Sequence, residues 1–240
     1  MATIAGNLQA IKARIAAASA AAGRDPASVR LLAVSKTHPA PLLAEACAAG
    51  QRAFGENYVQ EAVAKMEALA RLVGADAARA LEWHLIGPLQ SNKTRVVAEH
   101  FAWVHTIERE KIAHRLSEQR AASLAPLQVL VQVNVSGEAS KSGVALGDVA
   151  VLACAVAAMP RLRLRGLMAI PEPSDDAAIQ RASFRAVRVL FERLVADGLA
   201  LDTLSMGMSD DMEMAIAEGA TMVRIGTAIF GPRERARSAA

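Results

Sequence analysis

A single lysine stands at the end of an apolar run near the start of the sequence. The stretch LLAVSKTHPA, residues 31–40, reads as a buried strand that ends at Lys36, before a Thr-His-Pro turn. Side chains alternate along a strand, so Leu32, Val34 and Lys36 share one face. Burial disfavours the charged form of an amine, and a neutral amine can attack a carbonyl group to form a Schiff base. The alternative is a lysine that simply extends its ammonium group to water.

Two glycine-containing segments near the C-terminal end could bind a phosphate group. They are LSMGMSDDMEMAIAEGA, residues 204–220, and MVRIGTAIFG, residues 222–231. Gly207 and Ser209 precede a predicted helix, while Gly226 and Thr227 follow a predicted strand. Glycines let backbone N–H groups approach an anion, and a helix N-terminus adds a favourable dipole. The alternatives are that Ser209 is an ordinary helix cap and Gly226 an ordinary turn glycine.

Arg224 adds a guanidinium group close to these segments. It alternates with Met222 and Gly226, so it can face the mouth of a barrel, where it must find an acceptor; an ion pair with an interior carboxylate is the alternative. Asp210 and Asp211 count against an anion unless their side chains turn away. An amine, a phosphate cradle and a guanidinium fit the aldehyde, phosphate and ring nitrogen of pyridoxal 5'-phosphate (PLP). A Schiff-base aldolase for a sugar phosphate would use a similar lysine and cradle.

The elements that would position these residues alternate along the chain. An amphipathic first helix, with apolar residues at helical spacing, ends at Gly23. We expect strands at 31–35, 52–54, 82–86, 102–107, 127–135, 164–169, 202–206 and 221–226, and helices near 40–49, 56–73, 91–100, 109–121, 145–158, 177–196 and 209–218. Eight such units favour an α/β fold with a single (β/α)8 TIM-type barrel and an extra N-terminal helix, with an open doubly wound sheet as the alternative. We expect one domain over residues 1–232 and a short basic tail over 233–240.

The composition argues against several other classes of protein. A net charge of +3 and 3% aromatic residues give neither a concentrated basic face nor a set of base-stacking rings, so we expect no nucleic-acid partner. The five histidines lack ligand spacing, so we expect no metal site. We expect no membrane span and no signal peptide, and we interpret Cys47 and Cys154 as reduced core thiols. These features together predict a cytoplasmic protein.

Longer motifs resemble a known family. The segments AVSKTHP, FGENYVQE, WHLIGPLQSNK, VNVSGEASKSG, RGLMAIP, LSMGMSDDME and MVRIGTAIFG resemble the pyridoxal phosphate homeostasis protein family, whose members are relatives of the N-terminal barrel of alanine racemase. By this resemblance, Lys36 matches the lysine that forms the internal aldimine with PLP, and Arg224 matches the arginine that faces the pyridine nitrogen. Ser209, Gly226 and Thr227 match positions around the phosphate.

The resemblance also implies further pocket residues and a function. The further pocket positions are Asn57, His84, Ser205 and Met206. The implied function is a monomeric protein that holds PLP without established catalytic turnover and helps to balance PLP, vitamin B6 and amino-acid and keto-acid pools, with PLP-dependent apo-enzymes as candidate recipients. A PLP-dependent racemase is the alternative, but racemization needs an acid or base on each face of the substrate carbon. The only tyrosine, Tyr58, begins a helix, and the sequence ends soon after the eighth strand, so we expect the second catalytic group to be missing.

Overall fold

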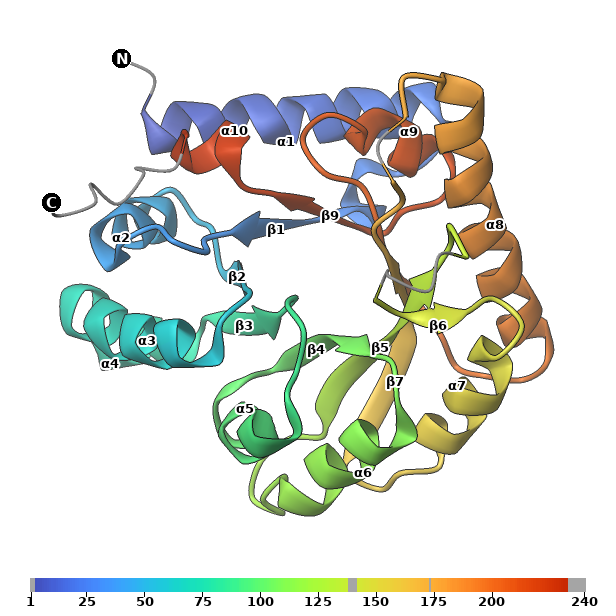
Figure 1. Cartoon of the computed structure of the whole chain (residues 1–240). Coiled ribbons are helices and arrows are strands. Elements are labelled where there is room, and N and C mark those ends of the chain that lie inside the picture. The colour runs from blue at the N-terminus through green and yellow to red at the C-terminus, as the bar shows by residue number, and fades with distance from the viewer. Residues whose placement is uncertain (1–2, 138–141, 173, 233–240) are drawn as a thin grey trace, which may run out of the picture.

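Eight parallel strands close into a barrel in the computed structural model, which describes residues 3–137, 142–172 and 174–232 (Figure 1). The strands are β1 Arg30–Val34, β2 Ala53–Glu56, β3 Glu82–Leu85, β4 Trp103–Ile107, β5 Leu127–Asn134, β7 Leu162–Ala169, β8 Thr203–Ser205 and β9 Met222–Ile225. Neighbours run in the order β4-β3-β2-β1-β9-β8-β7-β5, and the pairing of β4 with β5 completes the ring. All eight strands lie where the sequence predicts them, which confirms the barrel and removes the open-sheet alternative.

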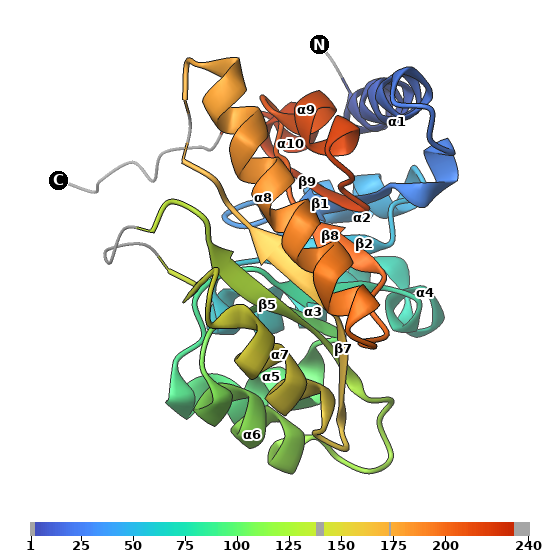
Figure 2. The same cartoon turned by 90° about the vertical axis from the view of Figure 1, so that its right-hand side faces the viewer.

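Helices surround this barrel (Figure 2). They are α1 Ile4–Ala21, α2 Ala40–Ala48, α3 Val59–Val73, α4 Ala75–Arg79, α5 Thr94–His100, α6 Glu110–Gln119, α7 Val149–Ala157, α8 Ala177–Ala196, α9 Met212–Ala217 and α10 Thr227–Phe230, with short 3-10 turns η1 Pro26–Ser28 and η2 Ser91–Lys93. The sequence did not predict α4, α10 or the two-residue strand β6 Val144–Ala145, which pairs with β5. These elements are too short to show a hydrophobic period.

The extra N-terminal helix is confirmed as α1. Its start is capped by the Thr3 hydroxyl, which accepts a hydrogen bond of 3.1 Å from the Gly6 N–H. Its buried face, at helical spacing, consists of Ile4, Leu8, Ile11, Ile15 and Ser19. This face packs against α9 and α10, along the top of the view in Figure 1. The helix therefore covers the two elements that follow the last two strands of the barrel.

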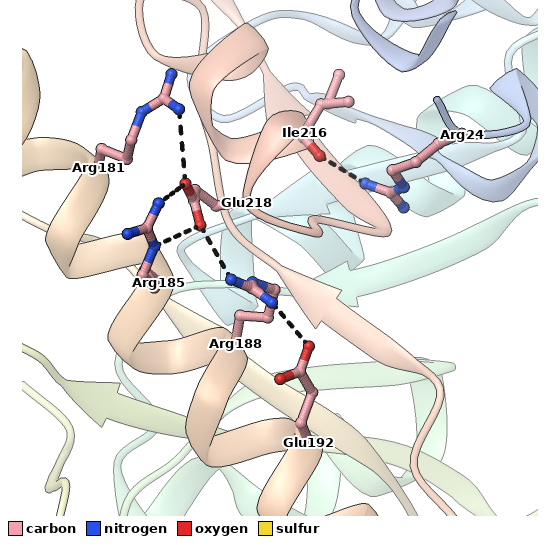
Figure 3. A network of polar contacts seen from close by, with 7 residues as sticks. All are labelled: Arg24, Arg181, Arg185, Arg188, Glu192, Ile216 and Glu218. Carbon is pink, nitrogen blue, oxygen red and sulfur yellow. Dashed lines mark hydrogen bonds and ion pairs between the residues drawn. The ribbon is translucent and has the colours of Figure 1, made fainter. Parts of the chain in front are cut away.

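Polar contacts fix α9 from both sides (Figure 3). Glu218, at the end of α9, is 3% exposed and faces three arginines of α8. These are Arg185, Arg188 and Arg181, with N···O distances of 3.1, 3.5 and 3.8 Å. On the other side, Nη1 of Arg24 donates to the carbonyl oxygens of Ile216 (2.7 Å) and Ala220 (2.8 Å). Since charge-assisted hydrogen bonds are the stronger kind, α9 has a well-defined position relative to the barrel.

Apolar side chains fill the space between strands and helices, and two small clusters fill part of the barrel interior. Leu32, Ala53 and Met222 form one interior cluster, and Trp103, Leu130 and Met168 form the other. Cys47 is buried as expected, but Cys154 is exposed on α7, so its interpretation as a core thiol is wrong. The alanine-rich sequence around it does not indicate which face of α7 is covered.

Three expectations concern membrane spans, metal sites and the C-terminal tail. None of the helices within the described ranges is long and apolar enough to cross a membrane. The same ranges contain no cluster of three or more histidine, cysteine or acidic side chains that could hold a metal ion. The predicted basic tail, residues 233–240, lies outside the described residues, so its boundary stays a prediction.

Candidate functional site

A cavity of about 510 Å³ lies where the barrel strands end. In barrels of this type, functional groups gather at the C-terminal ends of the strands. Six of the nine predicted site residues line this cavity: Lys36, Asn57, Ser209, Arg224, Gly226 and Thr227. They come from segments at or after β1, β2, β8 and β9, and the pairing of β1 with β9 brings the first two strands beside the last two. Their roles toward a ligand stay predictions.

Lys36 reaches the cavity from a tight turn directly after β1. The alternation expected from the sequence is present, because Leu32 lies in the barrel interior while Val34 and Lys36 line the cavity. Thr37 has a φ angle of 66°, in the left-handed region that side chains other than glycine avoid. Its N–H donates to Oε1 of Glu61 over 2.6 Å. This hydrogen bond offsets part of the conformational cost, which is on the order of 1–3 kcal/mol.

A buried ion pair supports the turn from behind. Nζ of Lys65 lies 2.6 Å from Oε1 of Glu56, 2.9 Å from Oε1 of Glu61 and 2.7 Å from the carbonyl oxygen of Ser35. The Ser35 hydroxyl also donates to Glu56 over 2.6 Å. Burial raises the pKa of Glu56, while the Lys65 ammonium acts in the opposite direction. Because Glu61 binds the N–H of Thr37, the network holds the residues on both sides of Lys36.

The loop after β8 forms one wall of the cavity and depends on Gly207. This glycine has a φ angle of 94°, and a Cβ atom added to it would lie 2.5 Å from the Cβ of Ala215. Only glycine fits both conditions. Two residues later Ser209 lines the cavity, and its carbonyl oxygen accepts a hydrogen bond of 3.1 Å from Arg14 of α1. The close approach of this loop to α9 therefore requires the glycine.

The acidic pair after Ser209 divides between the cavity and the protein interior. Asp211 is buried and accepts hydrogen bonds from the N–H of Met208 and from Gln180, so it turns toward the protein. Asp210 is exposed and lies among the residues that line the cavity. The helix α9 begins only at Met212, preceded by Asp211, so Ser209 is not its cap residue. The objection that two carboxylates face an anion thus applies only to Asp210.

The loop after β9 forms the neighbouring wall. A Cβ atom on Gly226 would lie 3.2 Å from the carbonyl oxygen of Val34, so a glycine allows this segment to pass close to β1. Thr227 begins the short helix α10, and the first N–H groups of a helix have no partner within the helix. Asn7 of α1 holds this helix in place by donating to the Ile229 carbonyl oxygen over 2.8 Å. Both loops at the cavity are thus fastened to α1.

Arg224 is almost fully buried at the wall of the cavity, with 4% of its surface exposed. Its Nη1 donates to the carbonyl oxygen of Ser205 (2.6 Å) and to the Ser205 hydroxyl (2.9 Å), and its Nη2 donates to the Ala169 carbonyl oxygen (2.8 Å). These acceptors are neutral, unlike the carboxylate that the alternative interpretation required. Burial lowers the pKa of Arg224 to about 10, while Asp211 opposes that shift. The guanidinium therefore stays charged at neutral pH.

Three predicted site residues lie outside the lining of the cavity. Met206 belongs to the hydrophobic core, and Ser205 lies behind Arg224 and accepts its hydrogen bond. His84 is completely buried, with its Nδ1 2.9 Å from Nε2 of His105. The assignment of these three residues to the ligand site therefore stays a prediction.

Other lining residues were not predicted from the sequence. His38, Ile86, Ile170 and Met208 all line the cavity. The ring of His38 packs on Phe230 of α10, with 5.1 Å between ring centroids. A signal for His38 was available, because it lies two residues after Lys36 in the same turn. The apolar residues gave no such signal, because they resemble ordinary core positions.

The fold and cavity define a class of protein: a (β/α)8 barrel with a lysine after its first strand and glycine loops after its last two. Residues 6–234 match the family model described as alanine racemase, N-terminal domain. The chain belongs to the pyridoxal phosphate homeostasis protein family, as the sequence motifs predicted.

Three relatives show how far the similarity extends. The pyridoxal phosphate homeostasis protein of Pseudomonas aeruginosa is 62% identical over 234 residues, covering 98% of this chain and 97% of the relative. The protein of that name from Escherichia coli K12 is 57% identical over 231 residues, covering 96% and 97%. The solved structure of PipY from Synechococcus elongatus with PLP bound has a TM-score of 0.82 and 38% identity, covering 95% of this chain and all (100%) of PipY.

Proposed function

We propose that this protein binds PLP in the cavity, as a Schiff base on Lys36, and serves PLP homeostasis without catalytic turnover of its own. The observation that carries the proposal is that Lys36, Arg224 and both glycine loops line one cavity. The names of the relatives and the PLP bound to PipY support the choice of ligand. Lys36 would form one C=N bond with the aldehyde carbon as one water leaves.

Asn57 and the two glycine loops also fit this ligand. The Oδ1 atom of Asn57 is buried and has no hydrogen-bond partner among the described residues. A buried acceptor of this kind costs free energy unless a ligand or ordered water donates to it. Gly207 and Gly226 let the two loops pack closely against α9 and β1, and the residues of these loops line the cavity, which suits a phosphate group. When bound, PLP supplies a reactive aldehyde and an electron-withdrawing ring.

Two features favour storage of PLP over racemization. Arg224 stays charged at neutral pH and would disfavour a proton on a nearby ring nitrogen, which electron withdrawal by the ring requires. Tyr58, the only tyrosine of the chain, is 60% exposed and is not among the residues that line the cavity. It therefore does not supply the second acid or base that a racemase needs. Racemization of a common amino acid by the purified protein would contradict this part of the proposal.

Borohydride trapping tests the covalent attachment. Incubation with PLP should give an absorbance band at a longer wavelength than the absorbance of the protein alone. Borohydride should then fix the cofactor on Lys36, because only an imine is reduced to a stable secondary amine. Peptide mapping by mass spectrometry identifies the labelled lysine. Lys36→Ala should lose the label and keep its circular dichroism spectrum. A label on Lys93 in the parent protein would refute the assignment.

The phosphate cradle is tested separately with pyridoxal, which lacks the phosphate group. Charge-assisted hydrogen bonds contribute roughly 1.5–3 kcal/mol each, so pyridoxal should bind at least tenfold more weakly than PLP. Equal dissociation constants would remove Ser209, Gly226 and Thr227 from the proposed site. The Lys36 assignment would survive that result, because the imine forms at the aldehyde.

We also propose that the protein is a cytoplasmic monomer that supplies PLP-dependent apo-enzymes. Sedimentation analysis would measure the mass in solution. Mixing the loaded protein with an apo-aminotransferase, with a trap for free PLP present, would show whether transfer is direct. Recovery of enzyme activity only in the absence of the trap would contradict direct supply.

A further inference from the structure

A chain of polar side chains crosses the barrel interior, a region that barrels of this type usually fill with branched aliphatic side chains. It contains Arg224 of β9, Ser205 of β8, His105 of β4, and His84 and Glu82 of β3. Successive distances are 2.9 Å from Arg224 Nη1 to Ser205 Oγ, 3.1 Å from Oγ to His105 Nδ1, 2.9 Å from His105 Nε2 to His84 Nδ1, and 3.8 Å from His84 Nε2 to Glu82 Oε2. Ser205 and both histidines are completely buried.

The arginine end fixes the direction of the three hydrogen bonds from Arg224 to His84. Arginine can only donate, so the Ser205 oxygen accepts from it, and the Ser205 hydroxyl hydrogen has His105 Nδ1 as its acceptor. His105 therefore carries its hydrogen on Nε2 and donates to Nδ1 of His84. His84 must then carry its hydrogen on Nε2, which has no hydrogen-bond partner among the described residues and has the Glu82 carboxylate as its nearest anion, 3.8 Å away. The reverse arrangement would leave the serine hydrogen without an acceptor and turn a ring lone pair toward an anion.

Burial keeps both imidazoles neutral. Burial lowers the pKa of His84 to about 4, although Glu82 acts in the other direction. Burial also places the pKa of His105 well below 6.5, and the positive charges of Arg224 and Arg30 act in the same direction. The Trp103 ring stacks on His84 with 5.2 Å between centroids and excludes water from that side. The chain can thus keep one arrangement of hydrogens over a wide range of pH.

We propose that His84 and His105 are positioning residues for Arg224. As neutral rings with hydrogen on Nε2, they hold the Ser205 hydroxyl as an acceptor and so fix the guanidinium group at the wall of the cavity. The hydrogen bonds end at His84, whose Nε2 lies 3.8 Å from the Glu82 carboxylate and makes no hydrogen bond among the described residues. The inference rests on the proposed function in one respect only, namely that Arg224 faces bound PLP.

The first experiment needs no cofactor. Long-range proton–nitrogen correlation spectra of the protein without PLP distinguish Nδ1–H from Nε2–H rings and detect protonation. We expect both His84 and His105 to show hydrogen on Nε2 only, without change from pH 8 to pH 6. Single His84→Gln and His105→Asn variants assign the signals. A ring with hydrogen on Nδ1, or a ring that becomes protonated above pH 6, would overturn the proposal.

The second experiment compares two replacements of His105 in the PLP-loaded protein. In His105→Asn the side-chain oxygen can replace Nδ1 as acceptor for Ser205, whereas His105→Leu keeps a similar volume and has no acceptor. We expect the leucine variant to shift the nitrogen-15 resonance of the cofactor ring and to raise the PLP dissociation constant at least threefold. The asparagine variant should stay within a factor of two of the parent.

The outcomes separate the two proposals. Borohydride labelling of Lys36 should persist in both variants. If the parent protein shows no label, the proposed function is refuted. The spectra recorded without cofactor would still test the two histidines in that case. Identical ring resonances and dissociation constants in the leucine variant and the parent would overturn the positioning role. If His105→Leu does not fold, Ser205→Ala removes the same hydroxyl contact, and the same shift is expected there.

Discussion

Nζ of Lys65 lies 2.6 Å from Oε1 of Glu56, and both side chains are buried behind the turn that carries Lys36. We predict that Glu56→Gln lowers the free energy of unfolding by about 1–3 kcal/mol, because Lys65 loses one charged partner and keeps only Glu61 and the Ser35 carbonyl oxygen. Urea unfolding would measure this. Asp76→Asn, which removes one partner of the exposed Arg79–Asp76 pair, is the control and should leave the urea midpoint unchanged.

The same variant tests whether the ion pair serves the cavity. Glu56→Gln weakens the network that holds Ser35 and Thr37, so Lys36 should lose its fixed position. The yield of borohydride label on Lys36 should fall under conditions in which the variant is still folded. An unchanged yield in folded protein would mean that the pair stabilises the barrel only.

A second prediction concerns Gly207, whose φ angle is 94°. Gly207→Ala should lower the free energy of unfolding by about 2–4 kcal/mol, from backbone strain of about 1 kcal/mol and overpacking against Ala215. Gly50→Ala is the matched control, since Gly50 has a φ angle of 88° and no atom within 4 Å of the added Cβ. Equal losses in the two variants would show that the contact with Ala215 contributes nothing.

A third prediction follows from the buried histidines. His84 has a pKa of about 4 in the folded chain and an ordinary value of 6.5 when unfolded, so the unfolded chain binds more protons between these pH values. The stability contribution is therefore complete above pH 6.5 and decreases as the pH falls toward 4, by about 3 kcal/mol for this one residue. Urea unfolding at intervals across this window would measure the slope. His84→Gln should flatten the slope, whereas replacing the exposed His114 by glutamine should not.

A fourth prediction concerns the charge beside the cofactor ring. Arg224→Glu should raise the pKa of the ring nitrogen of bound PLP and increase slow racemization or transamination of added amino acids. PLP affinity should fall as well, because a carboxylate would face the carbonyl oxygens of Ser205 and Ala169. Nitrogen-15 NMR of labelled PLP measures protonation directly. A ring that is already protonated at neutral pH in the parent protein would contradict the reasoning.

The sequence was sufficient to predict the barrel because its strands are short apolar runs, and segments with the hydrophobic periodicity of a helix separate them. The stretch LQVLVQVN of β5 is buried on both faces, as a strand of a closed parallel barrel must be. Lys36 and Arg224 were also found from alternation, since each follows the in–out pattern of its strand. Ser209 was located correctly at the cavity, although the helix that follows it begins three residues later than the pattern suggested.

The interior polar chain could not be predicted in the same way. Alternation places His84 and His105 on inward faces, but it does not tell which layer of the barrel each side chain occupies. That depends on the stagger between neighbouring strands, which pairs His84 with Trp103 and leaves His105 one layer nearer the cavity. The support of the Lys36 turn by Lys65 was likewise hidden, because a lysine inside an amphipathic helix resembles a surface residue.

The seam between β1 and β9 has a consequence for the synthesis of the protein. Leu32 pairs with Arg224 across this seam, and Asn7 binds Ile229, which lies 222 positions further along the chain. Contacts so distant in sequence form late, since a chain grows from its N-terminus and folds as it emerges. Lys36 is therefore made well before Arg224 and the loop after β9, which join it only when β9 has left the ribosome. A chain that has not yet added β9 has the lysine without its cavity, so the proposed PLP site is complete only after β9 has been made.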